Sequence, residues 1–173
     1  NVSDDWDYFE VMGLPHCFEI DSDELENLYQ RLSLEMHPDF FGVASEEKKI
    51  LSEKSSVMLN AAYSTLREPT SRAKYLLSLF AGERILQNNE LPEGFLQEMF
   101  SFQESLDEIL DSGDQSTLSR MNEDLHKRYN FVQFTFASLF KKLEKSTENT
   151  DILQQLQTQL NIERYLRRLL DRI

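Results

Sequence analysis

His37 and Asp39, which flank Pro38, are the residues of this chain whose types and spacing most readily suggest chemistry. An imidazole and a carboxylate on one turn can act as a general acid–base pair. Only two other histidines occur, His16 and His126. No Ser or Cys stands in a recognisable nucleophile context, and no glycine-rich phosphate loop or metal-ligand spacing is present. From the residues alone, two interpretations remain open, a catalytic dyad and an ordinary turn that ends a helix.

Two amphipathic helices are predicted on either side of this turn. The first begins at Asp21 or Ser22 and ends near Met36, because Pro38 has no amide to donate and restricts the residue before it. The second runs from about Glu46 to Leu66. Their predicted inner residues are Leu25, Leu28, Tyr29, Leu32 and Met36 on the first helix, and Leu51, Met58, Ala62 and Leu66, supported by Val57 and Ala61, on the second. Since a short loop joins them, the helices should form an antiparallel hairpin that presents the turn outward.

Two shorter helices and a polar linker complete the N-terminal half. Residues 4–14 are predicted to form a short helix, which Gly13 together with Pro15 brings to an end. Pro69 opens another helix, which Gly82 closes. Its predicted inner residues are Ala73, Leu76, Leu77 and Phe80. The following stretch, 82–91, is polar and irregular, so we predict that it links two domains.

Three further helices are predicted at about 92–111, 115–145 and 149–172. Apolar residues of the first two step alternately by three and four, as in coiled coils. They are Phe95, Met99, Phe102, Leu106 and Ile109, then Leu118, Met121, Leu125, Tyr129, Val132, Phe136, Leu139 and Leu143. The third helix is less regular, with Ile152, Leu156, Leu166, Leu170 and Ile173 nearest one face. Short turns predict an antiparallel three-helix bundle. The predicted fold is all-α, with a domain at 1–81, a linker at 82–91 and the bundle at 92–173.

One row of residues in the bundle does not belong to its predicted core. Leu96 and Phe100 lie about 100–140° away from the inner face of their helix, and Glu104 and Glu108 continue the same row. Such a row is either a docking surface or a surface that packs under the linker or the first domain. Tyr165 also lies off its helix's main face, where it either meets a partner or flanks the core.

Composition excludes several classes of function. The net charge of −13 would repel a phosphate backbone, so we expect no nucleic-acid partner, whereas a basic protein would be attracted. The single cysteine, Cys17, excludes an internal disulfide and fits a reducing compartment. No apolar run approaches the roughly 20 residues that span a bilayer. The acidic N-terminal residues do not resemble a presequence, so we expect a bacterial cytoplasmic protein in preference to one of the mitochondrial matrix.

The histidine–proline–aspartate turn occurs within a longer pattern. Tyr29-x-Arg31-Leu32 precedes it, and Asn60-Ala61-Ala62-Tyr63-x-x-Leu66 follows it. Over residues 5–81 this pattern resembles a J-domain. The resemblance implies that the domain does no chemistry itself and stimulates the ATPase of a DnaK/HscA-type chaperone. It implies that the chaperone-binding residues are His37, Pro38, Asp39, Tyr29, Arg31 and Asn60.

Three more motifs narrow the resemblance to one family. They are Asp7-Tyr8-Phe9-x-x-x-Gly13-Leu14-Pro15, Arg72-Ala73-x-Tyr75-Leu76-Leu77-x-Leu79 and Leu106-Asp107-Glu108-Ile109. Across essentially the whole chain the sequence resembles the HscB-type J-domain co-chaperones of iron–sulfur cluster assembly. This implies an L-shaped protein that is not an enzyme, holds no cofactor or metal, and acts as a monomer. It implies an IscU-type scaffold partner bound through Leu96, Gln97, Phe100, Glu104, Glu108 and Tyr165. The alternatives are a J-domain protein with another client, and an acidic helical interaction protein whose tripeptide is incidental.

Two features depart from the family pattern. J-domains usually carry several lysines and arginines on the helix before the loop, whereas this chain has Arg31 alone among several glutamates. This predicts either weaker chaperone binding or a contribution from Lys48, Lys49 and Lys54 on the next helix. Gln97 stands where the docking face usually begins with methionine or leucine, which predicts an altered affinity for the scaffold.

Overall fold

The computed structural model describes residues 5–36, 46–146 and 149–173, and every regular element in these ranges is a helix, as predicted. The helices are α1 (Tyr8–Met12), α2 (Ser22–Met36), α3 (Glu46–Arg67), α4 (Pro69–Phe80), α5 (Glu83–Leu86), α6 (Phe95–Ser112), α7 (Gln115–Leu143) and α8 (Thr150–Leu170). They form two compact units, one up to Leu76 and the other from Leu77 onward.

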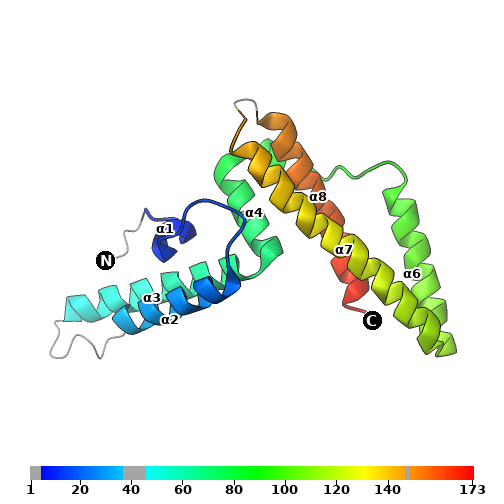
Figure 1. The fold of residues 1–173 in the computed structure, drawn as a ribbon, viewed down its shortest axis with the longest axis horizontal. Helices are drawn as coiled ribbons and strands as arrows, with labels where there is room; N and C mark the ends of the chain where they lie inside the picture. Colours follow the sequence, from blue (N-terminus) through cyan, green and yellow to red (C-terminus); the bar gives the residue numbers. More distant parts are fainter. Residues whose placement is uncertain (1–4, 37–45, 147–148) are drawn as a thin grey trace. The chain divides into compact units, whose positions relative to one another are not determined.

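The first unit is built on the predicted hairpin, in which α2 and α3 lie antiparallel and side by side (Figure 1). Asp21 is the residue that caps α2, because its carboxylate accepts hydrogen bonds from the amides of Asp23 and Glu24 at 3.0 and 2.9 Å. Leu25 of α2 is buried, and Leu28, Tyr29, Leu32 and Met36 are partly buried. The predicted stripe of α2 is therefore confirmed. The tripeptide itself lies outside the described residues.

The buried face of α3 differs from the predicted one. Leu51 and Val57, predicted to lie inside, are exposed, while Leu59 is buried. Among residues 50–67, where the burial of α3 is described, the buried residues are Ser52, Ser55, Leu59, Ala62 and Leu66, at steps of three and four. The prediction favoured large apolar side chains, but a serine can occupy an inner position when its hydroxyl has a partner. Ser52 donates a hydrogen bond to the carbonyl of Met36, the last residue of α2.

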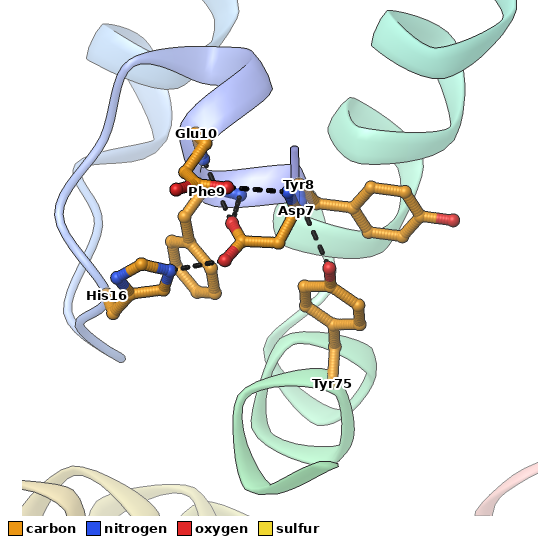
Figure 2. Close-up of polar contacts among 6 residues, drawn as sticks. All are labelled: Asp7, Tyr8, Phe9, Glu10, His16 and Tyr75. Carbon is orange, nitrogen blue, oxygen red and sulfur yellow. Dashed lines mark hydrogen bonds and ion pairs between the residues drawn. The ribbon is translucent and has the colours of Figure 1, made fainter. Parts of the chain in front are cut away.

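Helix α1 is shorter than predicted because Asp7 caps it (Figure 2). The Asp7 carboxylate accepts hydrogen bonds from the amides of Phe9 and Glu10 and lies 2.5 Å from Nε2 of His16. Burial acts to raise the pKa of Asp7, but these hydrogen bonds and the charge of His16 outweigh it and lower the pKa. Tyr75 of α4 accepts a hydrogen bond from the amide of Tyr8 at 3.0 Å, and the two rings stack. Helix α1 is thereby fixed to α4.

The second unit contains the predicted three-helix bundle, in which α6 runs antiparallel to α7 and α7 antiparallel to α8 (Figure 1). The predicted inner residues of α6 and α7 are all buried or partly buried, so both patterns are confirmed. On α8, Leu153 and Leu169 are buried, whereas the prediction placed Ile152 and Leu170 on the inner face. Ile173, also predicted there, is exposed.

The predicted linker is more ordered than its polar sequence indicated. It contains the short helix α5, which packs against α8. The buried Asn161 of α8 donates hydrogen bonds to the carbonyls of Asn88 and Glu90 at 2.9 and 3.1 Å. These bonds use backbone acceptors, which no side-chain pattern reveals. Phe80, predicted to face inward, is exposed.

Candidate functional site

The orientation of α6 is set by ionic contacts with the other helices of the bundle. Arg128 of α7 donates hydrogen bonds to Glu98 at 2.7 Å and Asp124 at 3.0 Å, and its guanidinium lies 4.9 Å from the centre of the Phe102 ring. Burial acts to lower the pKa of Arg128, but the hydrogen bonds to the two carboxylates outweigh it and raise the pKa. Arg172 binds Asp107 near the other end of α6.

A further row of α6 is exposed to solvent. We call Leu96, Phe100, Glu104 and Glu108 the outer stripe of α6. Leu96 is 53% exposed and Phe100 is 63% exposed, and both glutamates are exposed as well. Neither Glu104 nor Glu108 makes an ion pair with another of the described residues. An exposed leucine and phenylalanine on one row form a surface typical of protein docking.

The outer stripe borders a groove between α6 and α8, which we call the docking groove. It has a volume of about 320 Å³. Its lining residues are Leu96, Met99, Phe100, Gln103, Tyr165, Arg168 and Leu169. The structure thus brings Tyr165, predicted as a site residue, beside Leu96 and Phe100, although about 65 residues of sequence separate them. Gln97 is exposed one residue after Leu96 and is not part of the lining.

Tyr165 is held in place from two sides. Its ring meets the ring of Phe95 edge to face, with centroids 5.8 Å apart and planes at 84°. The guanidiniums of Arg164 and Arg168 each lie 6.0 Å from its ring centre. The sequence prediction missed Arg168 as a lining residue. Its position three residues after Tyr165, on the same face of α8, was the signal that could have found it.

In the first unit, two of the predicted chaperone-binding residues contact each other. The hydroxyl of Tyr29 on α2 donates to Oδ1 of Asn60 on α3 at 2.9 Å. The Tyr29 ring stacks on Tyr63, with centroids 4.1 Å apart, and the Tyr63 hydroxyl donates to Glu26. That hydrogen bond lowers the pKa of Glu26 and raises the pKa of Tyr63. This set of contacts, which we call the hairpin clamp, joins α2 to α3.

Of the other predicted chaperone-binding residues, Arg31 alone lies within the part of the chain that the structure describes. Arg31 is exposed on α2. His37, Pro38 and Asp39 lie outside the described residues, directly after the end of α2. Among the described residues, no three histidine, cysteine or carboxylate side chains are grouped so that they could hold a metal ion. No helix in the described part of the chain is long and apolar enough to cross a membrane.

Comparison with known proteins agrees with the two-unit architecture. The family model described as the DnaJ domain matches residues 7–75. The solved structure of the chaperone HscB from Vibrio cholerae superposes with a TM-score of 0.77 at 27% sequence identity, covering 96% of this chain and 94% of that one. The crystal structure of the human co-chaperone protein HscB gives a TM-score of 0.81 at 26% identity, covering 99% of this chain and 82% of that one.

Sequence relatives give the same family. The co-chaperone protein HscB of Proteus mirabilis is 34% identical over 125 residues, which cover 71% of this chain and 72% of that protein. The co-chaperone protein HscB homolog of Shewanella amazonensis is 30% identical over 146 residues, which cover 84% of this chain and 82% of that protein. With a J-domain before a helical bundle that matches solved HscB structures over nearly its whole length, this chain belongs to the HscB family of co-chaperones.

Proposed function

We propose that this co-chaperone delivers an IscU-type iron–sulfur scaffold protein to a DnaK/HscA-type ATP-driven chaperone and so promotes cluster transfer. In this proposal the first unit engages the chaperone and the docking groove of the second unit engages the scaffold. The observation that carries the second assignment is the convergence of Leu96, Phe100 and Tyr165 on one groove. Family membership supports the first.

The docking groove has the composition of a protein-binding site. Leu96 and Phe100 would bury apolar surface that is now in water, and such side chains supply most of the binding energy at protein interfaces. Glu104 and Glu108 extend the contact along α6 toward a basic region of the scaffold. Because both carboxylates are exposed, they would act mainly on the association rate and on the orientation of the scaffold.

On the chaperone side, we assign the stimulatory contact to the loop that carries His37, Pro38 and Asp39. The Asp39 carboxylate would meet an arginine of the chaperone, and hydrolysis would occur in the chaperone, because this chain contributes no reacting group. Tyr29 and Asn60 would act by keeping α2 and α3 in register, since they bond to each other. Arg31, with its exposed side chain, would contact the chaperone surface directly.

Joining the two sites in one chain raises the effective concentration of the scaffold at the chaperone. Once one partner is bound, the encounter with the other becomes intramolecular, which can increase overall avidity by roughly 10²–10⁴ without any new contact. Co-chaperone activity should therefore depend on both sites being present in the same molecule.

An ATPase assay of the chaperone, run with and without scaffold, tests the division of labour. Asp39→Asn should abolish stimulation of the ATPase while leaving scaffold affinity, measured by calorimetry, unchanged. Loss of both activities in a variant with an unchanged circular dichroism spectrum would contradict the two-site proposal.

The reciprocal variant combines Leu96→Ala with Phe100→Ala. Scaffold affinity should fall by about 10- to 100-fold, as expected for central apolar residues of an interface, while stimulation of the chaperone without scaffold is retained. Val57→Ala, an equally exposed apolar residue on α3, is the matched control and should not alter scaffold affinity. Unchanged scaffold affinity in the double variant would show that Leu96 and Phe100 do not belong to the scaffold interface.

A further inference from the structure

Helix α7 carries an exposed surface that takes no part in the proposed binding of the chaperone or of the scaffold. Its residues are Lys127, Phe131, Phe134, Ser138 and Lys141 of α7, followed by Lys145 just after the helix ends, and we call them the outer row of α7; Ser138 is partly buried and the others are exposed. The five that lie on the helix, from Lys127 to Lys141, are spaced by four, three, four and three residues, so they share one face of α7. At 100° per residue, this face points about 150° away from the buried row that includes Leu125, Val132, Phe136 and Leu139.

The centre of the outer row is apolar. Phe131 and Phe134 are 67% and 71% exposed, more than any other phenylalanine that the structure describes. Phenylalanine is not a strong helix former, so local helix stability does not account for two of them on a solvent-facing row. Two large aromatic side chains three residues apart form a contiguous apolar surface, which in a soluble protein is typical of a protein contact.

The ends of the outer row are basic, in contrast with the rest of the chain. The row carries three lysines and no carboxylate, whereas the whole sequence has a net charge of −13. At one end, Lys141 and Lys145 line a hollow of about 450 Å³ together with Ser138 and Lys142. The helix dipole favours lysines in the last turn of α7, but it explains neither Lys127 nor the phenylalanines.

We propose that the outer row of α7 docks an acidic, amphipathic helix of a partner protein. Apolar side chains of that helix would seat against Phe131 and Phe134, and its carboxylates would meet Lys127 at one end and Lys141 and Lys145 at the other. Its helical part, from Lys127 to Lys141, spans 14 residue steps, or about 21 Å, which matches a partner helix of roughly four turns. The alternating steps of three and four are those of paired helices.

Charge favours an acidic protein segment over an anionic membrane. A chain with a net charge of −13 is repelled by an anionic bilayer, and three lysines in one row offset only part of that repulsion. A single acidic helix meets the outer row alone and avoids most of that repulsion. The docking groove is lined by residues of α6 and α8, so it shares no residue with the outer row, and both can be occupied at once.

The test uses the full-length chain and a synthetic 18-residue helical peptide with leucines on one face and glutamates on both flanks. The wild-type chain should bind this peptide with an affinity that falls as salt increases. Phe131→Ser combined with Phe134→Ser should weaken binding by about tenfold or more. Lys127→Gln with Lys141→Gln and Lys145→Gln should weaken it at low salt and have less effect at high salt.

Control measurements separate this surface from the docking groove. Leu96→Ala with Phe100→Ala should leave peptide affinity unchanged. The variant that combines Phe131→Ser with Phe134→Ser should keep the wild-type circular dichroism spectrum and the wild-type scaffold affinity. The proposal is overturned if the peptide does not bind, or if a scrambled peptide of equal composition binds as well. It is also overturned if the phenylalanines instead mediate self-association in sedimentation, or binding to vesicles containing phosphatidylserine in the absence of peptide binding.

Discussion

The hairpin clamp and the outer stripe of α6 combine aromatic and carboxylate side chains in opposite ways. In the clamp, Tyr29 stacks on Tyr63, and the Tyr63 hydroxyl donates to Glu26 across two helices. On α6, Phe100 and Glu104 follow one another along a single helix, and both are exposed. Aromatic and acidic groups that meet across helices fix the fold. The same kinds of group, when they lie along one helix and are exposed, remain available to contact a partner molecule.

Buried and exposed apolar residues show the same contrast. Leu59 is almost fully buried between the helices of the first unit, whereas Phe100 is larger and lies mostly in water. The free energy that a side chain contributes to folding follows the apolar area it removes from water and the packing around it. Phe100 should therefore contribute little to folding and much to binding, and Leu59 the reverse.

Leu59→Ala compared with Phe100→Ala gives the largest expected effect. Truncating Leu59 should lower the free energy of unfolding by about 2–5 kcal/mol, because it leaves a cavity among buried residues. Phe100→Ala should change it by no more than about 0.5 kcal/mol, as is usual at exposed sites. Urea unfolding followed by circular dichroism measures both. If Phe100→Ala lowered the free energy of unfolding as much as Leu59→Ala, Phe100 would be a residue that stabilises the fold, and the proposed difference between the two residues would be wrong.

The sequence predicted elements better than it predicted contacts between them. The stripes of α2, α6 and α7 followed from periodicity because their inner residues are large and apolar. On α3 the same reasoning failed, since Ser52 and Ser55 occupy inner positions and Ser52 bonds to the end of α2. Periodicity carries no information about a hydroxyl that is satisfied by another helix.

The docking groove could be predicted only in part. The outer stripe of α6 followed from helical geometry and Tyr165 from family resemblance. Their meeting depends on the register between α6 and α8, which are linked by the contact of Arg172, just after α8, with Asp107 of α6. Such long-range pairs are absent from local sequence patterns. The exposed Phe131 and Phe134 of α7 were visible in the sequence, but their exposure required the packed structure.

Asp7→Ala gives the intermediate effect, and this effect should depend on pH. Removing this cap should destabilise the first unit by about 1 kcal/mol at pH 7. The folded-state pKa of Asp7 lies below its usual value of 3.8. The stabilisation is therefore fully present above that value and is lost as pH falls through the lower folded-state pKa.

The difference in unfolding free energy between wild type and Asp7→Ala should thus shrink as pH falls below 3.8 toward the lower folded-state pKa. Asp5→Ala is the matched control, because Asp5 is exposed two residues earlier. Urea unfolding at pH 7, 4 and 3 measures the difference. If the difference in unfolding free energy stayed constant with pH, the charge of Asp7 would not contribute to stability, and the hydrogen-bonding geometry of the cap would account for the whole effect.

Glu104→Gln combined with Glu108→Gln should have the smallest effect, and it tests how far the outer stripe extends beyond its apolar end. An exposed carboxylate loses little hydration when a partner binds, and its interaction with the partner adds little binding free energy. Scaffold affinity should therefore fall only about threefold at low salt. The loss should appear in the association rate and should vanish as salt screens the charges. Surface plasmon resonance at two salt concentrations resolves both features, with Glu123→Gln on α7 as the control. If the variant changed the dissociation rate instead, and did so at high salt, the two glutamates would be buried in the complex. The interface would then cover the whole length of the stripe and not only its apolar end.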